Sequence, residues 1–348
     1  MKNTTVHYGD YLQLDKILAA QQPESFKAGQ LPAHDEMLFI IIHQTYELWF
    51  KQIQFEVDAV IDTLSNPRLD DNSADLQTIV HRLQRVVTIL KVLVQQIDII
   101  ETMTPMDFLD FRDMLRPASG FQSWQFKKLE ATLGLQFEQR HGHEYYTSQL
   151  KENEVAIIKE AEKSNSVILL LNTWLERMPF LDNESLWINY KPVSGGDQPL
   201  HFFKEYEQIY IAGLADAEKN NEVFFKQIFY DTASNINRQL TAKACRNALF
   251  IMLYRGYPML ELPFQLLESL LAIDSQLGNW RYRHLNMVQR MIGTRIGTGG
   301  SSGAGYLKAA IDKHSIFKEI AQLNSFLIDR RKLPTLPKEL TEKLGYSF

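Results

Sequence analysis

Residues 35–65 read DEMLFIIIHQTYELWFKQIQFEVDAVIDTLS and contain neither proline nor glycine. Apolar side chains recur in this segment every three or four positions, which is the repeat of an amphipathic α-helix. The recurring positions are Phe39, Ile42, Tyr46, Trp49, Ile53, Val57, Val60 and Leu64. The pattern therefore predicts one long helix with an apolar face. Asp35 stands where an N-cap residue accepts a hydrogen bond from the first turn, so we expect it to cap this helix.

The same repeat continues along most of the chain. Residues 74–103 predict a second long helix, which Thr104-Pro105 ends. The linker between the two, residues 66–73, is short and polar, so we expect an antiparallel hairpin. Further helices are predicted at 106–115, 122–134, 152–177, 202–230, 239–256, 261–276, 279–292 and 306–327.

Strand signals are scarce, because no run of alternating apolar and polar residues lies between tight turns. Residues 183–200 resemble a long connection rather than a linker between domains. The predicted fold is therefore all-α, with few or no strands, and residues 1–348 are expected to form a single domain.

Composition narrows the class of protein. The 348 residues are 45% hydrophobic and 23% charged, with a net charge of −5 and no long basic run, which argues against a general nucleic-acid partner. A single cysteine, Cys245, excludes an intrachain disulfide and a cysteine-rich metal site. The N-terminus lacks the apolar region of a secretory signal, and no apolar stretch has the length of a membrane span. We expect a cytoplasmic protein without a membrane partner.

His43 is unusual because it interrupts an apolar helical turn, and burial disfavours a charged imidazole. Two readings stay open: a core histidine hydrogen-bonded to a neighbour, or a neutral imidazole that faces a pocket. Phe39 lies one turn earlier on the same face. The sequence HQTYE at 43–47 lacks the HExxH pattern, so a zinc protease site is not supported.

His284 lies in NWRYRHLNMVQRMIG, residues 279–293, and shares a predicted helix face with Trp280, Val288 and Met291. An imidazole in such apolar surroundings suits an axial ligand of haem iron, although a core histidine is the plainer reading. The same segment carries three arginines that either contact haem propionates or form a solvated basic face: Arg281, Arg283 and Arg290.

Two further features have both a functional and a plain interpretation. Phe108 and Arg112 are one turn apart, so the arginine either holds a carboxylate above an apolar slot or forms a surface ion pair. The glycine-rich GTGGSSG at 297–303 is either a mobile lid with Thr298 as its polar contact or a flexible linker. It lacks the preceding strand and the GK[ST] of a phosphate-binding loop.

Taken together, five segments resemble the tryptophan 2,3-dioxygenase family. They occur in the family's order across almost the whole chain, whereas residues 140–240 carry little of the signature. The segments are YGDYLQLDKILAAQ at 8–21, HDEMLFIIIHQTYELWFKQI at 34–53, FRDMLRPASGFQSWQFKKLE at 111–130, PFQLLESLLAIDS at 263–275 and WRYRHLNMVQRMIGTRIGTGGSSGAGYL at 280–307.

The resemblance implies long antiparallel helices around a haem pocket, and an enzyme that uses ferrous haem b. It implies cleavage of the indole C2–C3 bond of L-tryptophan with O2 to give N-formylkynurenine, the first step of the kynurenine pathway. It also implies a homotetramer. A related haem enzyme acting on another indole amino acid and a non-catalytic haem sensor are the alternatives.

Carried over by position, the resemblance gives four polar residues a role. His284 matches the proximal ligand of the iron, and His43 matches the distal histidine that meets the indole N–H. Arg112 matches the arginine that binds the substrate carboxylate. Thr298 matches a threonine that contacts the ammonium and carboxylate end.

Other matched positions shape the pocket. Phe39 and Phe108 match aromatic walls around the indole, and the second of these is tyrosine in some family members. Ser119 and Gly120 match a turn beside haem and substrate. An N-terminal element expected to reach into a neighbouring subunit's pocket carries Tyr8, Tyr11 and Leu12.

Overall fold

The computed structural model describes residues 5–69, 73–140, 143–190, 199–230, 238–298 and 303–346. Within these ranges the regular elements are α-helices and short 3-10 helices without a strand, which confirms the predicted all-α class. Nor does any helix in these ranges combine the length and apolar character that a membrane span requires. The longest helices are α3 (Glu36–Leu64), α4 (Ala74–Ile100) and α12 (Pro258–Ile292).

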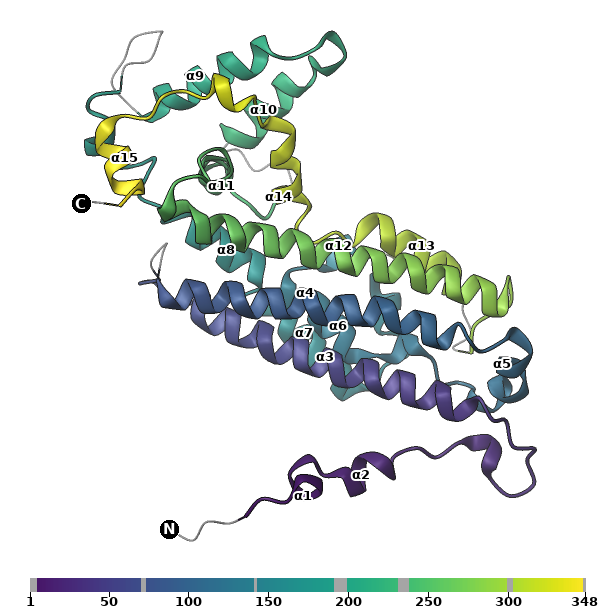
Figure 1. The fold of residues 1–348 in the computed structure, drawn as a ribbon. Helices are drawn as coiled ribbons and strands as arrows, with labels where there is room; N and C mark the ends of the chain where they lie inside the picture. Colours follow the sequence, from purple (N-terminus) through teal and green to yellow (C-terminus); the bar gives the residue numbers. More distant parts are fainter. Residues whose placement is uncertain are drawn as a thin grey trace.

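The predicted hairpin of α3 and α4 is present, and α12 lies along α4 (Figure 1). Fully buried aliphatic side chains such as Val57 and Leu83 fill the space between the helices. The Tyr46 hydroxyl donates to the Leu93 carbonyl at 2.9 Å and joins α3 to α4. The Ser73 side chain caps α4 by accepting a hydrogen bond from the Leu76 amide at 3.1 Å.

Shorter helices pack around α3, α4 and α12. One group packs beside the long helices, with α7 resting on α6: α5 (Pro105–Arg112), α6 (Trp124–Leu133), α7 (Glu152–Lys163), α8 (Val167–Glu176) and α13 (Gly303–Lys313). A second group gathers at one end of the molecule (Figure 1): α9 (Pro199–Ala212), α10 (Asn221–Phe229), α11 (Ala242–Leu253), α14 (Lys318–Leu323) and α15 (Lys338–Leu344).

Several predicted helix boundaries are wrong. The helices expected at 261–276 and 279–292 form the single helix α12, in which Gly278 has no close neighbour and does not interrupt the backbone. Conversely, residues 152–177 form two helices because Ser166 starts α8 anew by capping the Leu169 amide at 3.4 Å. Residues 202–230 likewise divide into α9 and α10.

The predicted helix at 306–327 is also divided, and Asp274 of α12 accounts for the break. Its carboxylate accepts hydrogen bonds from the Ser315 hydroxyl at 2.6 Å and from the Ile316 and Phe317 amides at 2.9 Å each. These contacts hold the end of α13 and the start of α14 against α12.

Asp35 does not cap α3 with its side chain, contrary to the prediction. Its backbone is already helical, with φ −77° and ψ −7°, whereas a capping residue is normally extended. The carboxylate of Glu36 instead accepts hydrogen bonds from the Glu24 and Ser25 amides at 2.7 and 2.9 Å. It thereby anchors the chain that precedes α3.

The N-terminal arm, which comprises α1 (Tyr8–Leu12) and α2 (Leu14–Leu18), lies apart from the long helices (Figure 1). Gln21 makes a 2.6 Å hydrogen bond to Gln44 of α3, which fixes the end of the arm to the body. The Tyr8 and Tyr11 side chains are 71% and 74% exposed. The arm thus presents aromatic side chains that this chain does not cover.

The segment 183–200 is only partly a plain connection. It includes a 3-10 helix, Glu184–Trp187, whose tryptophan is fully buried and donates to the Phe180 carbonyl at 2.8 Å. Residues 191–198 lie outside the described ranges.

Candidate active site

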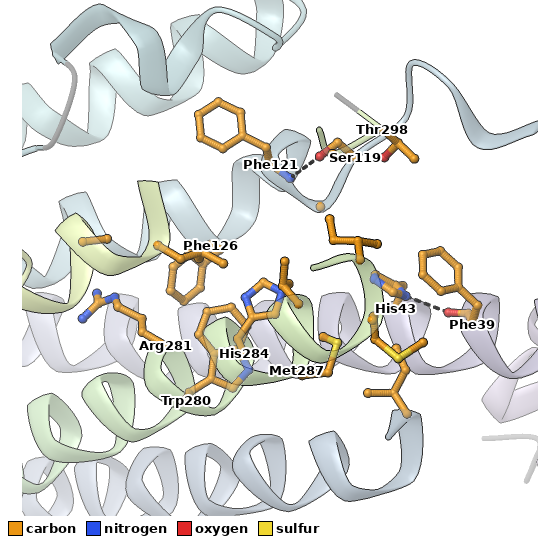
Figure 2. A pocket seen from close by; sticks show the side chains of 18 of the residues that line it. Phe39, His43, Ser119, Phe121, Phe126, Trp280, Arg281, His284, Met287 and Thr298 are labelled. Carbon is orange, nitrogen blue, oxygen red and sulfur yellow. Dashed lines mark hydrogen bonds between the residues drawn. The ribbon is translucent and has the colours of Figure 1, made fainter. Parts of the chain in front are cut away.

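One cavity of about 250 Å³ collects side chains from α3, α5, α6, α12 and α13 and from the turn around Ser119 (Figure 2). Most of the positions singled out in the sequence line it: Phe39, His43, Phe108, Arg112, Ser119, Gly120, His284 and Thr298. The arm residues Tyr8, Tyr11 and Leu12 do not line this cavity within the single chain.

His43 faces the cavity from α3, and a hydrogen bond on its own helix sets its tautomer (Figure 2). The Nδ1 atom lies 2.7 Å from the Phe39 carbonyl oxygen. Because a carbonyl only accepts, Nδ1 carries the hydrogen, and in the neutral ring Nε2 is left as an acceptor. Desolvation by burial lowers the pKa of His43 below its ordinary value of 6.5, so the imidazole is neutral at pH 7.

His284 faces the same cavity from α12 (Figure 2). Burial lowers the pKa of His284 to about 4, and repulsion from His43, when that ring is protonated, acts in the same direction. Its Nδ1 atom is sealed in the interior without a hydrogen-bond partner among the described residues, which leaves Nε2 for the cavity. The Trp280 ring packs beside the imidazole with a centroid distance of 5.1 Å. A neutral imidazole of this kind can act as a metal ligand.

Few kinds of metal site are compatible with these side chains. In the part of the chain that the structure describes, no three His, Cys, Asp or Glu side chains form a group that would hold a metal ion. A metal bound through His284 would thus take most of its ligands from a cofactor, as haem iron does from its porphyrin. Apolar residues line the space around His284, among them Phe126, Met287 and Val288. The residues present therefore fit a haem.

Arg112 is an incompletely neutralised cation at the cavity. It is 5% exposed and donates through Nη2 to the Ile296 carbonyl, while its Nε has no partner among the described residues. Its nearest carboxylate is that of Asp113, at 3.8 Å and largely in solvent. A buried guanidinium with spare donors suits a ligand carboxylate.

Aromatic rings line the neighbouring part of the cavity. Phe39 and Phe108 are stacked at 5.7 Å with an interplanar angle of 30°, and Phe111, which is fully buried and does not line the cavity, supports Phe108 edge-on at 5.4 Å. Such a wall favours a flat aromatic ligand. Thr298 also lines the cavity, but residues 299–302 of the predicted glycine lid lie outside the described ranges.

The three arginines near His284 lie in different surroundings. Arg283 pairs with Asp98 at 2.6 Å and Glu101 at 3.2 Å, and Arg290 is exposed. Arg281 alone of the three lines the cavity, where it pairs with Glu130 at 2.8 Å.

Sequence reasoning missed the buried ionic cluster around Glu130. Its carboxylate accepts from Arg140 and Arg281 at 2.8 Å each and contacts His314 at 3.3 Å. Burial raises the pKa of Glu130, but hydrogen bonding from His314 and the charge of Arg140 outweigh it and hold the pKa well below its usual range. These residues come from distant parts of the chain and form no motif, so only the fold brings them together.

The sequence as a whole matches one family of known proteins. A family model described as tryptophan 2,3-dioxygenase matches residues 1–327. The chain is 41% identical to a tryptophan 2,3-dioxygenase of Bdellovibrio bacteriovorus over the full length of both proteins. It is 44% identical to one of Alteromonas mediterranea, covering 98% of this chain and 97% of the relative, and 40% identical to one of Dictyostelium discoideum, covering 99% and 89%.

Proposed function

The chain belongs to the tryptophan 2,3-dioxygenase family, and from this premise we propose that it cleaves the indole C2–C3 bond of L-tryptophan with O2 to give N-formylkynurenine. The observation that carries the proposal is the convergence of His284, His43 and Arg112 on one cavity. A metal-binding imidazole, a hydrogen-bond acceptor and a carboxylate-binding cation are the groups that this reaction needs from the protein.

We assign His284 as the residue that holds the iron of haem b. When bound, ferrous haem supplies the activation of O2. Desolvation of His284 keeps the imidazole unprotonated at pH 7, so a proton does not compete with the metal. The apolar side chains around it restrict access of water to the reacting groups.

Other residues that line the cavity orient the substrate. The Arg112 guanidinium binds the carboxylate of tryptophan through its free donors, and Thr298 contacts the ammonium and carboxylate end. The stacked Phe39 and Phe108 rings pack against the indole. Fixing both ends selects one enantiomer and directs the C2–C3 bond toward the site of O2 activation.

His43 receives the indole N–H. Its Nδ1 hydrogen is committed to the Phe39 carbonyl, so the Nε2 lone pair is available as an acceptor. This contact orients the ring and needs no transfer of the indole proton to His43.

Two measurements on the purified protein test the proposal. Its absorption spectrum, after reconstitution with haem, is expected to be that of a histidine-ligated haem. Incubation with L-tryptophan under O2 is then expected to give the ultraviolet absorption of N-formylkynurenine. A haem spectrum without product would favour a haem sensor, and absence of haem binding would refute the proposal.

We expect the His43→Ser variant to retain haem but to lose catalytic efficiency. Serine is too short to present an acceptor where Nε2 lies, and the loss of one hydrogen bond corresponds to roughly a tenfold fall in kcat/KM. Steady-state kinetics and the haem-to-protein ratio measure the two effects.

His81→Ser on the exposed face of α4 is the matched control and should leave both quantities unchanged. Since the pKa of His43 lies below 6.5, the fall of wild-type kcat/KM with decreasing pH should have its midpoint below pH 6.5. Loss of haem from His43→Ser would instead indicate a structural role for this residue.

We also propose that the chain assembles as a homotetramer in which Tyr8, Tyr11 and Leu12 reach a neighbouring copy's cavity. The exposed aromatic side chains of the N-terminal arm support this arrangement. A stripe on α3 adds to it, because Ile41, Leu48 and Phe55 recur every seven residues and are 45%, 56% and 70% exposed.

Glutamate substitutions in this stripe should dissociate the proposed tetramer. We expect wild-type protein to sediment with four times the mass of one chain, and Leu48→Glu combined with Phe55→Glu to lower that mass, because burying two carboxylates in an apolar interface is costly. Analytical ultracentrifugation measures the mass. Glu substitution at exposed Val223 of α10 is the control, and a wild-type that sediments as one chain would contradict the assembly.

A further inference from the structure

The wall that α6 contributes to the cavity contains a lysine that the proposed function does not use. Lys127 lines the cavity and is 6% exposed. Burial lowers its pKa to about 8, while the charge of Glu130 acts in the opposite direction. The side chain therefore remains mostly an ammonium at pH 7, although it is enclosed by protein.

This ammonium is only partly satisfied by the protein. It donates to the Phe121 carbonyl and lies 4.3 Å from the centroid of the Phe121 ring. No carboxylate oxygen of the described residues lies within 4.0 Å of its Nζ atom. An ammonium has three donors, so two remain for another acceptor. A buried cation in this state is costly unless an anion joins it.

The other cations of the cavity wall are already assigned. Arg281 is neutralised by Glu130, which also serves Arg140. Arg112 is committed to the carboxylate of the amino acid under the proposed function. Lys127 thus forms no ion pair of its own with the described residues, and carboxylates such as Glu130 and Glu47 act on it only from a greater distance.

We propose that Lys127 binds a propionate carboxylate of the haem. This inference rests on the proposed function, which places haem in the cavity that Lys127 lines. Haem carries two propionates, and each is an anion that a buried ammonium can stabilise through charge-assisted hydrogen bonds. Lys127 would thereby add to the affinity of the protein for the macrocycle.

Haem dissociation tests the proposal without reference to turnover. Wild-type, Lys127→Met, Lys127→Arg and Lys128→Met proteins are reconstituted with haem, and loss of haem to excess apomyoglobin is followed by absorption. We expect Lys127→Met to release haem about tenfold faster, the equivalent of one charge-assisted hydrogen bond. Lys127→Arg should restore most of the retention. Lys128, which faces outward toward Asp58 at 3.9 Å, is the matched control and should behave as wild type.

Haem dimethyl ester separates propionate binding from a structural role. The ester keeps the iron and the macrocycle but lacks both carboxylates. If Lys127 acts on a propionate, wild-type and Lys127→Met proteins should release the ester at equal rates. If Lys127 only supports the Phe121 turn, the variant should release haem and ester faster by the same factor, which would overturn the proposal.

The remaining outcomes are also decisive. Unchanged haem release together with a raised KM for L-tryptophan would assign Lys127 to the substrate and reject the propionate contact. A wild-type protein that binds no haem would reject the proposed function itself. Normal haem binding with no effect of Lys127→Met would reject only this inference.

Discussion

We expect the His284→Ala variant to lose the absorption spectrum of a histidine-ligated haem and, with it, the oxidation of L-tryptophan. Alanine removes the imidazole, and the described residues offer no group of side chains that would hold the metal in its place. The effect should exceed the roughly 10- to 100-fold loss that follows removal of a mere supporting contact to a metal ligand. The Soret band, the haem-to-protein ratio and the rate of product formation measure it.

The control for this variant is His34→Ala, which changes an exposed histidine before α3. Added imidazole should fill the space left in His284→Ala and restore part of the spectrum. An unchanged Soret band and coordination state in His284→Ala would show that another residue holds the iron.

The second large effect is expected for Arg112→Ala. The guanidinium is buried, has a free Nε and pairs only with the exposed Asp113 carboxylate at 3.8 Å, so it can bind a substrate carboxylate. Loss of a charge-assisted contact costs about 3 kcal/mol, so KM for L-tryptophan should rise roughly 100-fold. Haem content should not change. Steady-state kinetics and haem titration give the two values.

Two comparisons sharpen this test. Arg116→Ala removes a neighbouring but exposed arginine that pairs with Asp113 at 3.2 Å, and its KM should equal that of wild type. Tryptamine lacks the carboxylate, so its binding to haem-loaded protein should be similar in wild type and Arg112→Ala. An unchanged KM for L-tryptophan in Arg112→Ala would reject the carboxylate assignment.

The long helices were predictable because the spacing of their apolar residues indicates which face becomes buried. The repeat through Ile53 and Val57 identified α3, and both side chains are fully buried. Boundaries were less accessible, because they depend on contacts distant in sequence. Asp274 divides α13 from α14 across the fold, and no local signal near residue 315 shows this.

The candidate site was likewise predictable only in part. Periodicity alone left His43 and His284 as two isolated histidines with no reason to meet, and only the family resemblance paired them. The fold then brought them to one cavity. Lys127 and Glu130 were not predicted, since a lysine and a glutamate on an amphipathic helix usually face solvent, and their burial follows from the packing of α6 against α7 and α3.

The acceptor of the His43 Nδ1 hydrogen is a main-chain carbonyl, not a side chain. The backbone of α3 therefore determines which nitrogen of His43 carries the proton. This hydrogen bond needs no ligand, and it does not depend on which side chain stands at position 39. The aromatic side chain there is free to vary with the shape of the substrate, while the imidazole continues to offer the same nitrogen. Residue 39 thus contributes to two separate aspects of substrate recognition. Its side chain contacts the indole ring, and its carbonyl group orients the imidazole that accepts the indole N–H.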